Sequence, residues 1–187
     1  MHRHFMLHKP DGYMSQFVCE LKKKKVLGDF FDFPPGTMSI GRLDEDSEGL
    51  LLLTTDGMMS ENIRSKKVEK EYYVLIDGII TADALEKLCN GVEIGIHNEK
   101  YITLPCKAFV LDMEPDIAPR KKRIRDNRHG PVQWISITIS EGKYRQVRKM
   151  TAAVGFPTLR LVRVRIANMH LNNLKAGEVM EVEKFDY

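Results

Sequence analysis

The strongest constraint on the fold is a strict alternation of side chains in the stretch "WISITIS", residues 134–140. Isoleucine occupies every second position and alternates with Trp134 and with Ser or Thr. Because successive side chains of a β-strand point to opposite faces, this pattern predicts a strand with one buried face. The turn-forming pair Glu141-Gly142 follows, and beyond it the spacing of apolar residues predicts a helix over residues 143–154.

The other predicted elements are short. Asp56 and Thr81 each stand where an N-cap is expected, before helices that begin at residues 57 and 82. Strand composition is found at residues 5–10, 72–76, 158–166 and 178–185. Strands outnumber helices and most links are short, so the predicted fold class is α+β, with a largely antiparallel β-sheet flanked by helices. A chain of 187 residues is expected to form one domain or two small lobes.

The sequence lacks the features of exported or membrane proteins. The longest apolar run in the first half of the chain is Leu50 to Leu53, far short of the roughly 20 residues that span a bilayer. The N-terminus has no apolar segment of the kind found in signal peptides. The cysteines, at positions 19, 89 and 106, have no C-x-x-C spacing, which argues against a disulfide framework or a zinc site. We therefore expect a cytoplasmic protein without a bound metal.

Basic residues are concentrated in two segments. Residues 142–177 contain eight Lys or Arg and no Asp or Glu, although the formal net charge of the chain is only +3. Residues 119–131, "PRKKRIRDNRHGP", add six basic residues against one acid. Aromatic side chains, among them Trp134 and Tyr144, are interleaved with the charges. These segments could be ordinary solvated faces, but together they favour a nucleic-acid partner.

An acidic segment, "GRLDEDSEGLLLLTTDG", occupies residues 41–57. Its first acids match the opening ligand positions of an EF-hand calcium loop. The match then fails, because the position that should supply a bidentate Glu is Thr55 and the intervening positions are leucines. A solvated acidic loop remains an alternative for this segment.

Asp44 stands out among these acids. Gly41 permits a close approach of the backbone, Leu43 can anchor the loop in the core, and Arg42 would point the same way as Asp44 in an extended stretch. A neighbouring cation favours the ionised carboxylate by lowering its pKa. Such a group is suited to nucleophilic attack rather than to proton donation.

Four stretches of the sequence together resemble a known family. The acidic segment is similar to the signature of the RsuA/RluE family of RNA pseudouridine synthases, and three further stretches match in order: "KPDGYMS" (9–15), "KEYYV" (70–74) and "EGKYRQVRKM" (141–150). The departures are small. Lys143-Tyr144 stands where Arg-Asn is common, and Lys149 stands where a second Arg is usual.

The resemblance implies the pseudouridine synthase catalytic fold and an isomerisation of one uridine in structured RNA without a cofactor or metal. Asp44 would be the essential carboxylate, which either attacks C1′ or abstracts a sugar proton. Tyr72 would stack on the uracil and help to move the C5 proton, and Arg148 would pair with Asp44. Two alternatives stay open: Tyr72 as a plain aromatic residue on an edge strand, and Arg148 as a phosphate ligand.

The resemblance also suggests the substrate. The "KPDG" motif begins at Lys9, which leaves no room for the separate N-terminal RNA-binding domain of many relatives. We therefore expect residues 1–187 to form a single catalytic domain, built as one body or as two lobes around a central cleft. The chain is most similar to the short RluE-like branch, which acts on large-subunit ribosomal RNA. Small-subunit rRNA or tRNA is an alternative substrate, and a non-catalytic rRNA-binding or assembly protein is an alternative function.

The expected partner is a structured stem-loop of ribosomal RNA, bound by a monomer. The residues predicted to bind it are Lys9, Arg42, Arg120, Lys121, Lys122, Arg123, Arg125, Lys143, Arg145 and Lys149.

Overall fold

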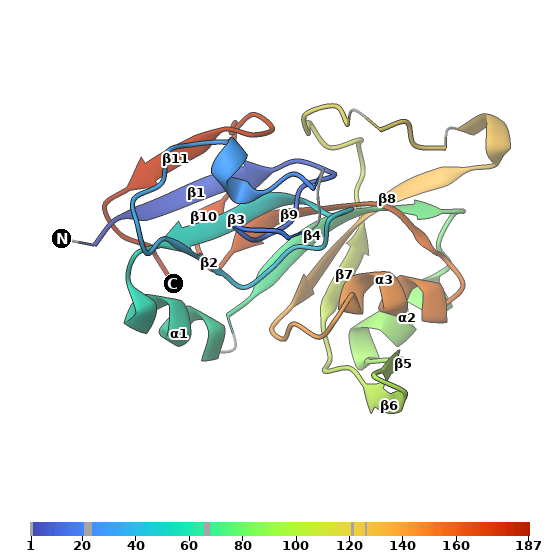
Figure 1. The fold of residues 1–187 in the computed structure, drawn as a ribbon. Helices are drawn as coiled ribbons and strands as arrows, with labels where there is room; N and C mark the ends of the chain where they lie inside the picture. The colour runs from blue at the N-terminus through green and yellow to red at the C-terminus, as the bar shows by residue number, and fades with distance from the viewer. Residues whose placement is uncertain (1, 21–23, 66–67, 121, 126) are drawn as a thin grey trace. The chain divides into compact units, whose positions relative to one another are not determined.

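The computed structural model describes residues 2–20, 24–65, 68–120, 122–125 and 127–187 (Figure 1). Lys121, one of the predicted RNA-binding residues, lies outside these ranges. The strands are β1 (His4–Lys9), β2 (Met38–Ile40), β3 (Glu48–Thr54), β4 (Lys70–Asp77), β5 (Glu93–Ile96), β6 (Glu99–Ile102), β7 (Lys107–Val110), β8 (Val132–Ile139), β9 (Thr158–Ile166), β10 (Met169–His170) and β11 (Val179–Val182). The helices are α1 (Gly57–Ser65), α2 (Ala82–Asn90) and α3 (Gln146–Ala153), with short 3-10 turns at Leu27–Asp29 and Asn127–His129.

The fold class predicted from the sequence is confirmed. The strand pairs β1–β3, β1–β11, β4–β8 and β7–β8 are all antiparallel. The chain forms two compact units: unit 1 contains residues 1–68, 118–121 and 163–187, and unit 2 contains residues 69–117 and 122–162. None of the helices in the described ranges is long and apolar enough to cross a membrane.

Unit 1 is built around strand β3. Its leucines, Leu50 to Leu53, are fully buried, so the strand is covered on both faces rather than on one. β1 lies between β3 and β11, and β2 pairs with the end of β3. Helix α1 packs against β2 and β3. The start of α1 follows from the predicted cap, because the Asp56 carboxylate accepts a hydrogen bond of 3.1 Å from the backbone N–H of Met59.

Unit 2 contains the alternating strand, β8, which pairs with β4 on one side and β7 on the other. The isoleucines of β8 are buried as predicted, but Ser136 and Thr138 are buried as well. The expectation of a single buried face was therefore wrong. On this polar face the Ser136 hydroxyl donates to Glu71 at 2.9 Å, and the Arg160 guanidinium lies 6.0 Å from the centre of the Trp134 ring.

The two helices of unit 2 start where local capping sets them. The Thr81 hydroxyl accepts a hydrogen bond of 3.2 Å from Ala84 N, which confirms the predicted N-cap of α2. Helix α3 is shorter than predicted, because Arg145 adopts a left-handed conformation with φ 52° and the helix begins only at Gln146. α2 packs on β7, and α3 packs on β5 (Figure 1).

Candidate active site

Asp44 lies in the turn that joins β2 to β3 in unit 1, and its side chain is half-buried. The turn is closed by a hydrogen bond of 3.1 Å from Ser47 N to Asp44 O. Leu43 is buried and anchors the loop, as the sequence predicts. Gly41 is needed for its positive φ of 72°, not for a close approach, because a Cβ there would meet nothing within 4 Å.

The "KPDGYMS" segment braces this turn. The Ser15 hydroxyl donates to Leu43 O at 2.7 Å and accepts from Leu43 N at 3.0 Å, which satisfies both backbone groups of the residue before Asp44. On the other side of Asp44, Gly12 N donates to Glu45 O at 2.8 Å. Two residues of one motif, which is distant in sequence from Asp44, thus hold the backbone on both sides of Asp44.

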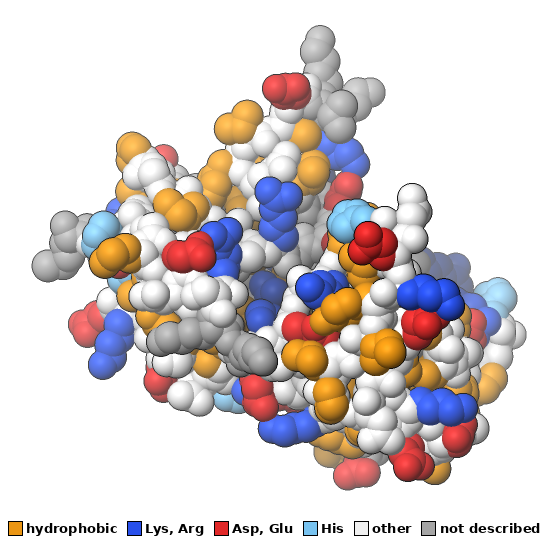
Figure 2. All heavy atoms as spheres, turned by 90° about the horizontal axis from the view of Figure 1, so that it is seen from below, with side chains coloured by type: hydrophobic (Ala, Val, Ile, Leu, Met, Phe, Trp, Pro, Cys, Tyr) orange, Lys and Arg blue, Asp and Glu red, His pale blue; other side chains and the backbone are white. Residues whose placement is uncertain are grey.

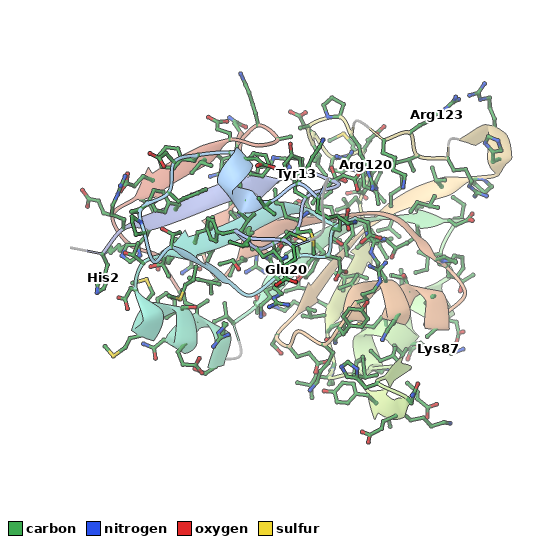
Figure 3. The ribbon with its side chains drawn as sticks, in the orientation of Figure 1. His2, Tyr13, Glu20, Lys87, Arg120 and Arg123 are labelled. Atoms are coloured by element: carbon green, nitrogen blue, oxygen red, sulfur yellow. The ribbon has the colours of Figure 1, made fainter. Side chains whose placement is uncertain are left out.

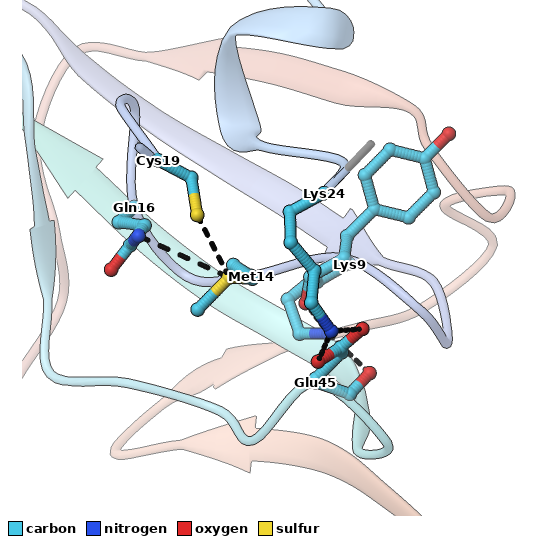
Figure 4. A network of polar contacts seen from close by, with 7 residues as sticks. Lys9, Met14, Gln16, Cys19, Lys24 and Glu45 are labelled. Atoms are coloured by element: carbon cyan, nitrogen blue, oxygen red, sulfur yellow. Dashed lines mark hydrogen bonds and ion pairs between the residues drawn. The ribbon is translucent and has the colours of Figure 1, made fainter. Parts of the chain in front are cut away.

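Lys9 belongs to this brace rather than to the surface. Its side chain is fully buried, and the ammonium donates to Tyr13 O at 2.7 Å and to Pro10 O at 3.0 Å. The ammonium also approaches Glu45 O at 3.4 Å, and both Lys9 and Glu45 are labelled in Figure 4. The predicted contact between Lys9 and RNA is thus contradicted by its burial. Sequence reasoning missed the structural role because a lysine at the end of a short strand usually reaches solvent.

The ammonium of Lys9 has an unusual titration. Burial lowers the pKa of Lys9 to about 8, although the negative charges of Asp11, Glu48, Asp46 and Asp44 act in the opposite direction. Lys9 is therefore still charged at pH 7, and its charge lies in the same network as the acids of the Asp44 loop.

A pH dependence of stability follows from Lys9. The folded protein loses this proton near pH 8 and the unfolded chain near 10.5, so between these values the unfolded chain binds more protons. The free energy of unfolding should then rise with pH in that window, by up to about 3 kcal/mol. We expect the difference in unfolding free energy between wild type and Lys9→Met to grow between pH 7.5 and 10.5 in urea titrations. A Lys87→Met variant, which removes an exposed lysine, is the control. A difference that does not change with pH would contradict the assignment.

Tyr72 and Arg148 lie in unit 2. Tyr72 is on β4, opposite Ile137 of β8, and only 8% of its surface is exposed. β4 has neighbouring strands on both sides, β8 and β9, so the alternative of an edge-strand aromatic is wrong. Arg148 is half-buried on α3. Asp44 belongs to unit 1, and the predicted pairing of Arg148 with Asp44 stays a prediction.

Glu141 fixes the segment that leads into α3. Its carboxylate accepts from the Tyr101 hydroxyl at 2.5 Å, from Leu104 N at 2.9 Å and from the Gln146 amide at 2.6 Å. The hydrogen bond to Glu141 raises the pKa of Tyr101. These contacts tie the first turn of α3, and with it the position of Arg148, to the hairpin formed by β5 and β6. No local pattern in the sequence singles out Tyr101 for this role.

The predicted RNA-binding residues have different environments. Arg42, Lys122, Arg123 and Lys143 are exposed, and Arg145 and Lys149 are half-buried. Arg123 and Arg120 are labelled in Figure 3. Arg120 is different, since only 7% of its side chain is exposed and it forms an ion pair with Asp11 and approaches Glu48 at 3.8 Å. Arg120 therefore anchors its segment to unit 1 instead of being open to RNA. Arg125 forms an ion pair with Asp77.

The basic side chains of residues 142–177 do not all lie at the surface. Arg160 and Arg163 are buried, and the Arg163 Nε donates to Leu50 O at 2.7 Å. These two arginines are not among the predicted RNA-binding residues, and their guanidinium groups are used inside the protein. On the face shown in Figure 2, Lys and Arg side chains lie among acidic and hydrophobic ones.

The class of the protein follows from its similarity to known proteins. A model of the family described as RNA pseudouridylate synthase matches residues 3–153, and the chain belongs to this family. The chain is therefore an RNA pseudouridine synthase, an enzyme that isomerises uridine in RNA.

The individual proteins to which the chain is similar are also named pseudouridine synthases or pseudouridylate synthases. The chain is 40% identical over 171 residues to "Ribosomal large subunit pseudouridine synthase E" of Xanthomonas axonopodis pv. citri, an alignment that covers 90% of this chain and 88% of the relative. It is 36% identical to "Ribosomal small subunit pseudouridine synthase A" of Salmonella typhimurium, over 94% of this chain and 68% of that protein. A solved structure titled "Crystal structure of pseudouridylate synthase" superposes with a TM-score of 0.77 at 32% identity, covering 97% of this chain and 70% of the other.

Proposed function

We propose that this enzyme converts one uridine of large-subunit ribosomal RNA to pseudouridine, with Asp44 as the essential carboxylate, acting as a cytoplasmic monomer without a cofactor. The proposed substrate rests on the 40% identity to "Ribosomal large subunit pseudouridine synthase E", which extends over 90% of this chain and 88% of the relative. The choice of Asp44 is supported by the brace around it, since a reacting carboxylate needs a fixed position and the backbone on both sides of Asp44 is held.

The chemistry places specific demands on the site. The N1–C1′ bond breaks, the uracil turns, and a C5–C1′ bond forms; the proton leaves C5 and N1 gains one, so the product is an isomer of the substrate. Asp44 starts this sequence, either by attack on C1′ or by removal of a sugar proton. The uridine must leave its helix to expose both atoms, at a cost of a few kcal/mol. Stacking on Tyr72 offsets about 1–3 kcal/mol of that cost.

Mapping of pseudouridine in cells tests this proposal. Total rRNA from a deletion strain, complemented with wild type or with Asp44→Asn, is treated with a carbodiimide and read by reverse transcription. We expect one large-subunit stop that disappears on deletion and returns only with wild type. If the lost site lies in small-subunit rRNA or in tRNA, the substrate assignment is wrong. If every site persists, a non-catalytic role in rRNA binding replaces the proposal.

The basic segment 119–131 gives a separate prediction about binding. The double variant Lys122→Gln/Arg123→Gln removes two exposed charges while it leaves the buried Arg120 ion pair intact. If both side chains contact phosphates, the slope of log affinity against log salt should become shallower by about 1 to 2. Lys87→Gln, a change at an exposed lysine on α2 that pairs with Asp83, is the matched control. An unchanged slope in the double variant would remove this segment from the interface.

A further inference from the structure

An exposed aromatic cluster is formed by Tyr144, just before α3, and His97, between β5 and β6. The strand β5 packs against α3, and both elements are labelled in Figure 1. The centre of the cluster is Tyr144, which is 60% exposed. His97, at the tip of the hairpin, lies beside it with ring centroids 6.2 Å apart and ring planes inclined by only 22°. Two nearly parallel rings are thus presented to solvent by two different elements.

Two lysines lie against aromatic rings at this junction, one against Tyr144 and one against the neighbouring Tyr101. The Lys149 ammonium lies 5.1 Å from the centre of the Tyr144 ring and is fixed by a hydrogen bond of 2.6 Å to Gly95 O. The Lys143 ammonium lies 4.8 Å from the centre of the Tyr101 ring. Contacts of this kind hold a cation in place without neutralising it. The cluster therefore presents positive charge next to an open aromatic surface.

A purely structural role does not account for Tyr144. The hairpin and α3 are already joined by the hydrogen bonds of Glu141 to Tyr101, Leu104 and Gln146. Tyr101 contributes its hydroxyl to that junction, whereas the ring of Tyr144 remains mostly in water. A large exposed ring flanked by cations is the arrangement with which proteins bind unpaired nucleotides, since every base offers a face for stacking and every linkage a phosphate.

We propose that Tyr144 and His97 form a stacking platform for an unpaired base of the RNA substrate, with Lys143 and Lys149 at the adjoining phosphates. The platform rests on the RNA-modifying activity of the family and is independent of which RNA carries the target uridine. It would favour single-stranded or looped RNA over a continuous duplex, because a base inside a helix has both faces covered. It lies on unit 2 alone, close in sequence to Arg148.

Binding of a short single-stranded RNA tests the platform directly. The probe is a fluorescent oligouridine of ten nucleotides, titrated with the full chain and followed by anisotropy. Loss of one stacked base should weaken binding of Tyr144→Ala by about 5-fold or more, whereas Tyr144→Phe, which keeps the ring, should stay within about 2-fold of wild type. Phe109→Ala, a change at a comparably exposed aromatic of unit 2 on β7, is the matched control and should bind as wild type does.

Salt dependence separates stacking from charge. Tyr144→Ala should keep the wild-type slope of log affinity against log salt, whereas Lys149→Met should make it shallower by about 0.7. Equal affinities of Tyr144→Ala, Phe109→Ala and wild type, in variants with unchanged melting temperatures, would overturn the platform. Because this readout needs no catalysis, Tyr144-dependent binding by a protein that leaves all large-subunit uridines unmodified would uphold the platform while it refutes the proposed substrate.

Discussion

Replacement of Asp44 by Asn is expected to lower the rate of pseudouridine formation by at least about 10³-fold in a protein that still folds. The amide of Asn has nearly the shape of a carboxylate but carries no charge, so it can neither attack C1′ nor abstract a sugar proton. The backbone of the turn is unaffected, since its hydrogen bond from Ser47 N is accepted by the main-chain oxygen of residue 44. Single-turnover assays on a large-subunit rRNA transcript, with the melting temperature measured in parallel, check this result.

The neighbouring acid provides the matched control for Asp44. The Glu45 side chain pairs with Lys24 at 2.7 Å, and both groups are about 40% exposed, so the pair adds little to stability. Glu45→Gln should therefore retain activity within about 2-fold of wild type, because none of the proposed chemistry uses its carboxylate. If Asp44→Asn keeps more than about a tenth of the wild-type rate, Asp44 is not the group that starts the reaction.

Gly49→Ala is expected to be the most damaging single-methyl change in unit 1. Gly49 lies in β3 with φ 106°, and a Cβ at this position would lie 2.2 Å from the main-chain O of Arg163 and 2.6 Å from its N. The methyl group thus meets rigid backbone and not a side chain that can move away, and the left-handed conformation adds strain. We expect a loss of at least about 3 kcal/mol, which lowers the melting temperature by about 6–12 °C.

A second glycine tests whether geometry, rather than loss of glycine itself, is responsible. Gly57 begins α1, and a Cβ there would meet nothing within 4 Å. Gly57→Ala should be neutral or slightly stabilising, because Ala has the higher helix propensity. Thermal unfolding of both variants distinguishes the cases: similar melting temperatures for Gly49→Ala and wild type would mean that β3 and the segment around Arg163 can separate at little cost.

Much of the fold could be read from local sequence. The alternation in "WISITIS" predicted β8, and the positions of Thr81 and Asp56 predicted the starts of α2 and α1, because these signals act over a few residues. The start of α3 was predicted three residues too early, at residue 143. The left-handed conformation of Arg145 cannot be recognised from the neighbouring residues, which favour a helix.

Part of the candidate site could also be predicted from local sequence, and part could not. The "GRLD" motif identified Asp44, and the burial of Leu43 agrees with the prediction of an anchored loop. The brace was not predicted, because the Ser15 hydroxyl meets Leu43 across 28 positions of sequence. The sequence predicts RNA contacts for Lys9 and Arg120 because long basic side chains are usually solvated, and such groups are buried only where specific partners are supplied.

Motifs and periodicity are properties of neighbouring residues, and they were enough to predict the family, the α+β class, the candidate carboxylate and the caps of two helices. The role of each charged side chain depends instead on contacts between distant segments. Arg120 finds Asp11 at a separation of 109 positions, and Lys9 meets the main chain of the Asp44 loop. Whether a basic side chain binds RNA or stabilises the interior depends on the burial and the partners that distant segments provide, and no local pattern carries that information.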